Sequence, residues 1–498
     1  MRCDTRRQPS RYRHVIIATA LAVALLAPIV PVTAQAQGSR ANQWVGTWAS
    51  GPVALPPSAA PAGNPPEASP FGNPPRIANQ TLRQIVRTSI GGSQVRVALT
   101  NRFGTTPLRI GGAHVAIREK GSAIVERLSA RLTFRGQPSV TVEARSMVVS
   151  DPVVLAVPAL SDLAIDIYLP DDLSNATSPA TYHPSALTTN YLSPPGNHSG
   201  AARMPVGSTF QQWFYLARVD VLSGAAPGAV VTIGDSITDG TGSTPDTNSR
   251  WPDFLARRLV AAYGASAPAV LNVGIAGNRV LSHNAGLDVL RRAGLNVPAS
   301  DALQDPNALF GPSGLSRFDE DVLLQPGVTH VIVLETINDI GMAFDAAPPT
   351  VKDLIAGHRA LIQRAHARGL RIYGGTLTPF KGAFYWTEAG EAKRRALNDW
   401  IRTGAEYDGA IDFEAVVRDP NDPSKFRPEF HPGDWLHGSD AGYKAMAGAA
   451  DLAVFAPARR RGTSAAGRAV PRTAGANRRF AASGISRTMM PLERPRLP

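Results

Sequence analysis

Residues 229–240 read AVVTIGDSITDG, so a continuous run of apolar and β-branched residues leads directly into a Gly-Asp-Ser tripeptide. Such an unbroken run is typical of a strand buried on both faces, as the strands of parallel sheets are. Ser236 comes just after the predicted end of this strand. Because ligands of open parallel sheets bind beyond the carboxyl ends of the strands, we expect a substrate to reach Ser236 there. A Gly-Asp-Ser turn is also an ordinary helix cap, so this stretch alone does not define an enzyme.

Apolar runs and stretches of helical pattern alternate from here to about residue 457. The runs predict further buried strands, and the stretches between or after them predict helices. The predicted strands lie at residues 269–273, 330–335, 370–374 and 410–413, and the predicted helices lie at 251–263, 350–368, 388–403 and 440–455. Strands that alternate with helices predict an α/β fold, so we expect a doubly wound parallel sheet over residues 225–457.

Residues 37–224 have a different pattern, in which short runs of alternating apolar residues are separated by Gly, Pro and other turn residues. Residues 82–90 and 94–100 are two such runs, and Gly91-Gly92-Ser93 between them predicts a β-hairpin. Many short strands without a long helical period predict an all-β domain, a sandwich or a jelly roll. The sequence therefore predicts a β-rich accessory domain ahead of the α/β domain.

Residues 1–36 have the pattern of a secretory signal peptide. A basic start is followed by an apolar run at residues 15–32 and by Ala34-Gln35-Ala36, the small-x-small pattern of a cleavage site. Two prolines interrupt the second half of the run, which favours cleavage over an uncleaved membrane anchor. We therefore expect an exported protein, periplasmic or secreted. The only cysteine, Cys3, lies in this segment, so the exported chain would have no disulfide and no thiol nucleophile.

The formal net charge of +12 comes from the two ends of the chain. Residues 1–14 carry five arginines and one aspartate, and residues 458–498 carry ten arginines and one glutamate. The residues between them carry a net charge of −1. A basic surface that would bind nucleic acid is therefore not indicated. The segment 458–498 is rich in Arg, Ala and Gly without apolar periodicity, which predicts a disordered basic tail.

Polar residues also follow two further predicted strands. Residues 272–278 read NVGIAGN, and Gly277 can present its backbone N–H to a ligand because no side chain intervenes. Residues 335–339 read ETIND, and Asn338 can offer an amide donor to the negative oxygen that develops in acyl transfer. Each stretch by itself is also typical of an ordinary turn at a strand end.

Asp434 and His437 lie three residues apart, just ahead of the last predicted helix. A serine nucleophile needs a base of near-neutral pKa, and the base needs an acceptor that orients it. The pair can supply both. His431, Asp434 and His437 are alternatively a set of metal ligands, but Pro432 and Gly433 disfavour the helix that would place them on one face. The sequence favours a base and its orienting acid over a metal site.

In this order, the four stretches resemble the SGNH hydrolases, the serine esterases and lipases also called the GDSL family. That family is named for Ser, Gly, Asn and His in four blocks, which correspond here to Ser236, Gly277, Asn338 and His437. Asp434 and the segment DAGY at residues 440–443 match the last block as well. The resemblance covers about residues 229–455.

Two residues depart from the family pattern. Thr336 stands two residues before Asn338, where the family usually has Gly, and Gly438 follows His437, where the family usually has Pro. The first change bears on how Asn338 approaches the oxyanion, and neither removes a reacting group. The β-rich first half is similar to the amino-terminal domain of some secreted bacterial members.

The resemblance implies nucleophilic acyl transfer without a metal or an organic cofactor. His437 would take the proton of Ser236 as the hydroxyl attacks an ester carbonyl, and Asp434 would orient the imidazole. The backbone N–H groups of Ser236 and Gly277 and the side chain of Asn338 would bind the oxyanion. Water would then hydrolyse the acyl-enzyme.

Three functions are compatible with these residues. The first is hydrolysis of a small-molecule or polysaccharide ester, for instance the deacetylation of carbohydrate, with the β-rich domain associating with glycans. The second is a lysophospholipase or short-chain lipase. The third is an inactive scaffold that binds glycans, against which the complete set of Ser, Gly, Asn, Asp and His argues. A lid-like amphipathic helix is not evident near the motifs, which favours a soluble substrate, although a fold does not settle a substrate.

Overall fold

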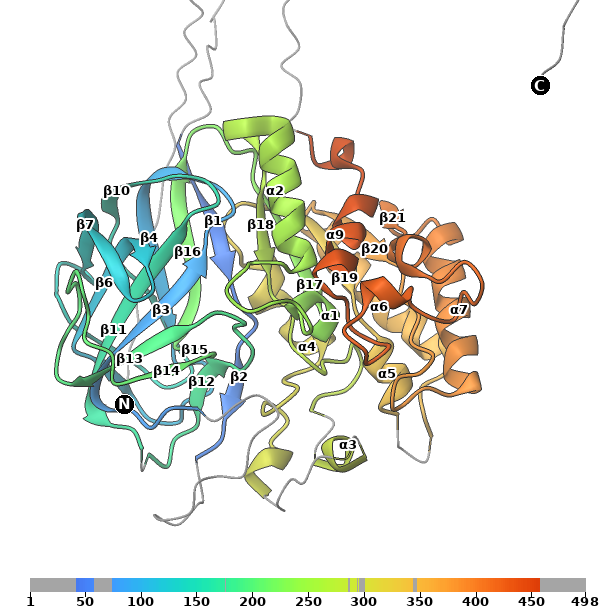
Figure 1. Ribbon diagram of the computed structural model, residues 1–498, viewed down its shortest axis with the longest axis horizontal. Helices are drawn as coiled ribbons and strands as arrows, with labels where there is room; N and C mark the ends of the chain where they lie inside the picture. Colours follow the sequence, from blue (N-terminus) through green and yellow to red (C-terminus); the bar gives the residue numbers. More distant parts are fainter. Residues whose placement is uncertain are drawn as a thin grey trace, which may run out of the picture.

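The computed structural model describes residues 42–57, 74–174, 176–284, 287–292, 294, 301–343 and 347–456. The predicted signal peptide, which includes Cys3, and the predicted tail at 458–498 lie outside these residues. The described residues form two regions side by side, a β-rich region from the first half of the chain and an α/β region from the second (Figure 1). Among the described residues, no helix combines the length and the apolar character that crossing a membrane requires.

The β-rich region consists of antiparallel strand pairs, as predicted. One sheet has the order β1-β16-β4-β10, with β9 also paired to β4, and a second has the order β14-β13-β3-β11-β6-β7. Two smaller sheets have the orders β15-β12-β2 and β5-β8. Both larger sheets bury side chains in one apolar core. The strands are β1 (Gln43–Ala49), β2 (Val53–Leu55), β3 (Ala78–Arg87), β4 (Gly92–Thr100), β5 (Leu108–Ile110), β6 (Gly112–Lys120), β7 (Ala123–Leu132), β8 (Val140–Val142), β9 (Met147–Val149), β10 (Val153–Val157), β11 (Asp162–Asp172), β12 (Ala180–His183), β13 (Asn190–Pro195), β14 (Ser208–Phe210), β15 (Trp213–Phe214) and β16 (Leu216–Ser223).

The hairpin predicted around Gly91-Gly92-Ser93 is wrong. Strand β3 pairs with β11 and β13, whereas β4 pairs with β16, β10 and β9, so the two strands belong to different sheets. These two positions are glycine because neighbouring atoms leave no room for a side chain, and not because the chain makes a tight turn. A Cβ on Gly91 would lie 2.4 Å from the carbonyl oxygen of Val157, and a Cβ on Gly92 would lie 2.7 Å from Cβ of Val221. The chain crosses here from one sheet to the other, and both strands contribute side chains to the shared core.

The α/β region contains a five-stranded parallel sheet with the order β18-β17-β19-β20-β21, which confirms the predicted parallel sheet. Its strands are β17 (Ala229–Gly234), β18 (Ala269–Asn272), β19 (Val328–Leu334), β20 (Arg371–Gly375) and β21 (Gly409–Ile411). Strand β17 lies between two neighbours, and all of its residues are buried. Its unbroken apolar sequence follows from that position, because helices cover both faces of the sheet.

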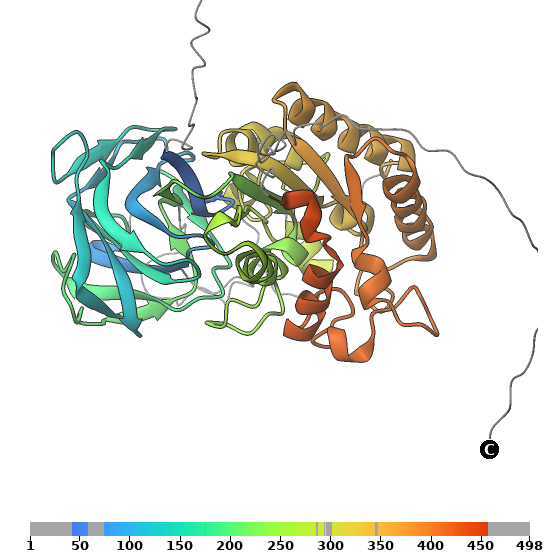
Figure 2. The same cartoon turned by 90° about the horizontal axis from the view of Figure 1, so that it is seen from above.

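The helices of the α/β region fall into two layers. Helix α2 packs with α9 on one side of the sheet, and α6 packs with α7 on the other (Figure 2). The last predicted helix is shorter than expected, because α9 ends at Ala449 and a single 3-10 turn follows at Leu452–Phe455. The helices are α1 (Ser236–Asp239), α2 (Trp251–Tyr263), α3 (Leu287–Arg292), α4 (Gly314–Phe318), α5 (Ile337–Gly341), α6 (Val351–Ala367), α7 (Glu388–Thr403), α8 (Phe413–Val417) and α9 (Asp440–Ala449).

Three of the predicted site residues follow three neighbouring strands of this sheet. Ser236 follows β17, Gly277 follows β18 and Asn338 follows β19. The chain runs from β17 outward to β18 and then returns past β17 to β19, so the strand order reverses at this point. Ligands bind at such a reversal because the loops on its two sides diverge and leave a crevice at the carboxyl ends of the strands.

The β-rich and α/β regions pack directly against each other. Gly46 of β1 lies against the side chain of Leu271 in β18, and a Cβ on Gly51 would lie 2.8 Å from the carbonyl oxygen of Val273. Buried residues of both regions belong to one continuous apolar cluster. The chain of the β-rich region therefore lies against the end of β18, from which the loop with Gly277 departs. The domain boundary predicted near residues 224 and 225 stays a prediction.

Candidate active site

Ser236, His437 and Asp434 are joined in one chain of hydrogen bonds. Nε2 of His437 lies 2.8 Å from Oγ of Ser236, and Nδ1 of His437 lies 2.5 Å from Oδ2 of Asp434. Ser236 and His437 are 201 positions apart in the sequence. The structure thus brings the predicted nucleophile, base and orienting acid together.

The fold places Ser236 through a short helix. Ser236 is the first residue of α1, and the side chain of Asp235 caps this helix by accepting a hydrogen bond from the N–H of Ile237 at 2.9 Å. Gly240 ends the helix with a φ of 106°, a conformation that favours glycine. The N–H groups of a first helical turn have no partner within the helix. The N–H of Ser236 is therefore available at the carboxyl end of β17.

The loop that carries His437 is held against the loop that follows α1. The N–H of Thr244 donates to Oδ1 of Asp440 at 2.8 Å, and the hydroxyl of Tyr443 donates to the carbonyl oxygen of Thr241 at 2.5 Å. Gly438 lies against the ring of Tyr443, where a Cβ would come within 2.8 Å of ring atoms. These contacts explain why a glycine follows His437, and they fix the imidazole relative to the serine.

Asp434 is held in its ionised form. Its Oδ1 accepts hydrogen bonds from the N–H groups of Leu436 at 3.0 Å and His437 at 3.1 Å. Burial by itself would raise the pKa of Asp434, but the hydrogen bond and charge of His437, together with these backbone groups, lower the pKa to about 2. The carboxylate is therefore charged at neutral pH, where it stabilises a protonated imidazole.

Gly277 is required by both its conformation and its surroundings. Its φ is 75°, in the left-handed region. A Cβ at this position would lie only 1.9 Å from the ring of Phe310. Among the backbone hydrogen bonds of the described turns and loops, none uses the N–H of Gly277. This N–H is therefore free to face a ligand.

Asn338 lies at the start of α5, just past β19. Its Nδ2 donates to the carbonyl oxygen of Asn278 at 2.9 Å, and its Oδ1 lies 3.2 Å from the hydroxyl of Tyr385. Asn278 is the residue that follows Gly277, so this hydrogen bond ties the loop after β18 to the loop after β19. The loops that carry two of the three predicted oxyanion donors, Gly277 and Asn338, are therefore connected by a hydrogen bond.

Thr336 adopts a conformation that β-branched residues rarely take. Its φ is 104° and its ψ is −18°, in a region that normally selects glycine. Its Oγ1 is hydrogen bonded to Nε2 of His358 at 2.8 Å, and Nδ1 of His358 lies 2.5 Å from the hydroxyl of Tyr407. The departure from the family pattern at this position is therefore a strained backbone that buried hydrogen bonds hold in place.

A buried arginine, Arg317 of α4, connects the ends of the central strands. Its guanidinium donates to the carbonyl oxygens of Gly234 at 3.0 Å and Val273 at 2.5 Å, which close β17 and follow β18. Its Nε donates to Oδ1 of Asn278 at 2.9 Å, and its Nη2 lies 3.6 Å from Oε2 of Glu335. Arg317 is fully buried. One cation thus fixes the backbone beneath Ser236 and beside Gly277.

His431 is held apart from the hydrogen-bonded chain. Its Nδ1 accepts hydrogen bonds from the N–H groups of Gly433 at 3.0 Å and Trp435 at 3.4 Å, and its ring lies 4.2 Å from that of Trp435. Among the described residues, no group of three His, Cys, Asp or Glu side chains is arranged to hold a metal ion. The His431 ring therefore stabilises the conformation of the loop that carries Asp434.

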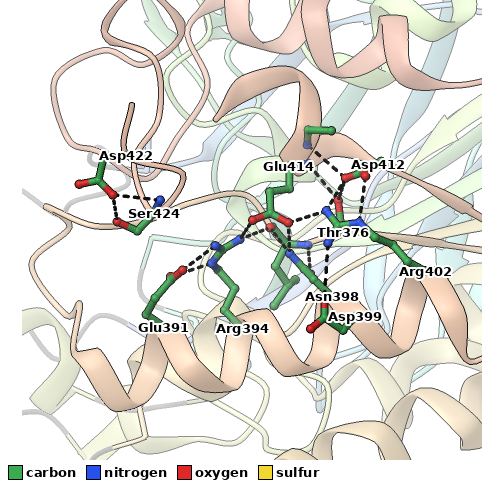
Figure 3. A network of polar contacts seen from close by, with 12 residues as sticks. Thr376, Glu391, Arg394, Asn398, Asp399, Arg402, Asp412, Glu414, Asp422 and Ser424 are labelled. Carbon is green, nitrogen blue, oxygen red and sulfur yellow. Dashed lines mark hydrogen bonds and ion pairs between the residues drawn. The ribbon is translucent and has the colours of Figure 1, made fainter. Parts of the chain in front are cut away.

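A polar groove lies beside the loop that carries Tyr385. The groove has a volume of about 550 Å³, and ten of its thirteen lining residues are charged. Many of these charges are paired, as Figure 3 shows for Arg394 with Glu391 and Glu414 and for Arg402 with Glu414. Residues 381 and 386 of the Tyr385 loop form part of its wall.

Sequence reasoning missed three residues that position the site. Arg317 and Tyr385 contact the loops of the oxyanion donors, and His183 of the β-rich region is hydrogen bonded to Asp239 at the end of α1. A lone arginine, tyrosine or histidine carries no periodic signal, and arginine is usually a surface residue. These contacts arise only when distant segments meet.

A hydroxyl, an imidazole and a carboxylate in this order are the groups that the catalytic site of a serine hydrolase contains. Residues 232–445 match the model of the GDSL-like Lipase/Acylhydrolase family. This match confirms the resemblance predicted for the second half of the chain, and it leaves the β-rich first half outside. No curated protein matches the chain.

Several solved structures are similar to the α/β region. A GDSL-like lipase from Bacteroides thetaiotaomicron is 17% identical, with 45% of this chain and 85% of that chain covered and a TM-score of 0.30. An alpha/beta hydrolase enzyme from the metagenome of Lake Arreo in Spain is 20% identical, with 46% and 96% covered and a TM-score of 0.33. A variant of an acetyl xylan esterase from Geobacillus stearothermophilus is 19% identical, with 48% and 98% covered and a TM-score of 0.32.

Proposed function

We propose that the protein is a serine esterase that hydrolyses carboxylic esters through an acyl-enzyme on Ser236. The observation that carries this proposal is the chain of hydrogen bonds from Ser236 through His437 to Asp434. A protein that only binds ligands has no need of a base in contact with a serine hydroxyl. The match of residues 232–445 to an acylhydrolase family supports a hydrolase.

In the first step, Oγ of Ser236 attacks the carbonyl carbon of the ester while Nε2 of His437 takes its proton. The tetrahedral intermediate then collapses, the bond to the leaving oxygen breaks, and His437 gives its proton to the departing alcohol. Water repeats the sequence on the acyl-enzyme and releases the acid. Asp434, which is charged at neutral pH, stabilises the imidazolium in both steps.

We assign the oxyanion to three donors that lie at the ends of adjacent strands. They are the backbone N–H groups of Ser236 and Gly277 and the side-chain amide of Asn338. Donors that are fixed before the reaction stabilise the developing charge without reorganising, which makes such a site effective. The buried contacts of Arg317 provide this rigidity, because they hold the strand ends beneath two of the donors.

We propose an acylated carbohydrate as the substrate class. The loop that carries Tyr385, which contacts Asn338, borders a groove that Ser236 itself does not line. The groove is lined mostly by charged side chains, which suit the hydroxyl groups of a sugar better than a fatty chain. Its wall includes Trp386, an aromatic residue of the kind on which sugar rings pack. A small acyl group, such as acetyl, accords with a serine that is only 6% exposed.

A panel of esters tests both the proposed esterase activity and the proposed carbohydrate substrate. Nitrophenyl esters of rising acyl length report whether the protein is an esterase, and acetylated xylan and pectin fragments report whether sugars are preferred. We expect turnover of the acetyl ester and release of acetate from the oligosaccharides. Activity confined to lysophospholipid or long acyl chains would overturn the carbohydrate assignment, and inactivity on every ester would overturn the esterase.

We further propose that the chain is exported and cleaved after Ala36, on the strength of the basic start, apolar run and small-x-small pattern of residues 1–36. Mass determination of the amino terminus of the protein recovered from the culture medium or periplasm tests this. A product that retains residues 1–36 in the membrane fraction would contradict it.

A further inference from the structure

The orientation of the Asn338 amide follows from its partners. The oxygen and nitrogen of an amide have nearly the same shape, so hydrogen bonds decide which atom faces which way. The carbonyl oxygen of Asn278 only accepts, and it lies 2.9 Å from one amide atom of Asn338. That atom must therefore be Nδ2. The other atom, Oδ1, faces the hydroxyl of Tyr385 at 3.2 Å, so the tyrosine donates.

This arrangement leaves one hydrogen of Nδ2 without a partner. An amide nitrogen carries two hydrogens, and Asn278 accepts one of them. Within the described part of the chain, no acceptor is seen for the second. Asn338 is 1% exposed, so this hydrogen is presented from a fixed and nearly dry position. It is the hydrogen that the proposed mechanism directs at the oxyanion.

Tyr385 is itself placed firmly. Its ring lies on the backbone of α5, since a Cβ on Gly341 would come within 2.3 Å of it. Two aromatic neighbours flank the ring, Phe384 with centroids 4.5 Å apart and Phe380 with centroids 6.0 Å apart. Burial raises the pKa of the Tyr385 hydroxyl well above its usual range, so the hydroxyl keeps its hydrogen.

The start of the loop that carries Tyr385 is anchored to α7. The N–H of Leu377 donates to Oδ1 of Asn398 at 2.7 Å, and the carbonyl oxygen of Leu377 accepts from Asn398 and Arg394, both at 2.9 Å. Arg394 and Asn398 in turn contact Glu414, and the network spans α7 and α8 (Figure 3). The loop therefore leaves the sheet from a fixed point.

We propose that Tyr385 is a positioning residue for the oxyanion, acting through Asn338. This inference rests on the proposed esterase function. The hydroxyl satisfies Oδ1 and polarises the amide, which strengthens Nδ2–H as a donor when negative charge develops on the substrate. A contact of this kind counts mainly in the transition state, so its loss lowers kcat and leaves KM nearly unchanged.

The experiment compares the wild-type protein with Tyr385→Phe on nitrophenyl acetate. Removal of the hydroxyl leaves Oδ1 of Asn338 buried without a donor, and the amide tilts to find one. We expect kcat to fall about 10-fold, with KM within about twofold. The affinity for a trifluoromethyl ketone, which forms a tetrahedral adduct with a serine, should fall by the same factor as kcat/KM. The matched control is Tyr263→Phe, which removes a hydroxyl that donates to the carbonyl oxygen of Leu452, and we expect its kcat to stay at the wild-type value.

A double-mutant comparison separates positioning from mere stability. In an Asn338→Ala background, Tyr385→Phe should have no further effect on kcat, because the group through which it acts is gone. An equal fall in kcat with and without Asn338 would overturn the inference, and so would an unchanged kcat in folded Tyr385→Phe. Failure of the proposed function looks different, since the wild-type protein itself would then not cleave esters.

Discussion

His183 and Asp239 form a buried hydrogen-bonded pair across the junction of the β-rich and α/β regions. Nε2 of His183 lies 2.9 Å from Oδ1 of Asp239, and Nδ1 lies 2.8 Å from the carbonyl oxygen of Gly51. Burial alone would lower the pKa of His183, but Asp239 and the Gly51 carbonyl raise it overall, which favours an ion pair. Asp239 ends α1, the helix that begins with Ser236. The β-rich region therefore holds the end of α1 that lies opposite Ser236.

Replacing this histidine should lower both stability and turnover. His183→Ala leaves Asp239 buried and unpaired, which costs about 3–5 kcal/mol in the free energy of unfolding. We also expect kcat per folded molecule to fall, because α1 loses its contact with the β-rich region. Urea unfolding and initial rates measure the two effects. The control is Asp166→Asn, which breaks a buried ion pair with Arg83 inside the β-rich region and should lower stability alone. Equal kcat values for both variants would contradict a role of His183 in placing the serine.

Ser236→Ala should abolish ester hydrolysis while the melting temperature stays near that of the wild-type protein. Loss of a nucleophile that acts together with its base costs several orders of magnitude in rate. Ser243, a buried serine in the loop after α1, supplies the control, and Ser243→Ala should retain activity. Residual activity of Ser236→Ala within a few-fold of the wild-type rate would place the nucleophile elsewhere.

Alanine substitutions of the two neighbouring histidines, His431 and His437, should have very different effects on turnover. His437→Ala removes the only imidazole that contacts Ser236 among the described residues, so turnover should nearly disappear. His431→Ala removes a ring that accepts backbone hydrogen bonds within its own loop, so the rate should fall modestly at most. Rates of both variants on nitrophenyl acetate decide the matter. The reverse order would show that His431, and not His437, is the base.

Glu335 should make the stability of the protein depend on pH. Both of its carboxylate oxygens are buried without a hydrogen bond, and burial together with nearby Asp235 raises its pKa well above the usual value. A raised pKa contributes stability that is complete below the unfolded pKa, near 4.3, and is lost as the pH rises through the folded pKa. Glu335→Gln resembles the protonated form at every pH. Its stability relative to the wild-type protein should therefore increase as the pH rises from 5 to 8.

Melting curves at several pH values measure this difference. Glu388→Gln, at an exposed position in the first turn of α7, is the control, and its difference from the wild-type protein should stay constant over the same range. A difference for Glu335→Gln that does not change with pH would mean that this carboxyl group titrates normally.

Thr336 allows the strain at the oxyanion loop to be measured. Both Thr336→Gly and Thr336→Ala lose the hydrogen bond to His358, but only glycine tolerates a φ of 104° without strain. We expect the glycine variant to be more stable than the alanine variant by about 1–2 kcal/mol, the reverse of the usual order. Thermal unfolding of the two variants gives the difference. An alanine variant that equals or exceeds the glycine variant would show that the backbone relaxes at no cost.

The sequence predicted the parallel sheet and its strand ends because the signals are local. The apolar run before Ser236 ends where the strand must end, and Gly277 and Asn338 occupy the same position after their own strands. Parallel strands align their carboxyl ends, so residues that follow these strands must lie near one another at one edge of the sheet. Asp434 and His437 could be predicted as an orienting acid and a base for a similar reason, since side chains three residues apart in a loop can contact each other.

The features that the sequence did not predict depend on contacts between distant segments, which no local pattern encodes. The sequence around Gly91 and Gly92 predicted a hairpin turn. These residues are glycine because a side chain would collide with the carbonyl oxygen of Val157 at the first position and with the side chain of Val221 at the second. Tyr385 meets Asn338 across 47 positions, and His183 meets Asp239 across 56. Such pairs are fixed by the packing of the whole fold, so a single sequence gives no sign of them.

The separation of Ser236 from His437 also sets an order of events during synthesis of the chain. The ribosome makes the serine first, and 201 further positions follow before the histidine appears. At usual rates of translation this takes about 10–40 seconds. Throughout that interval the nascent chain carries the proposed nucleophile without the proposed base, so the proposed esterase cannot yet attack the esters of the compartment in which it is made. The proposed site is complete only when the final segment of the α/β region folds back onto the first.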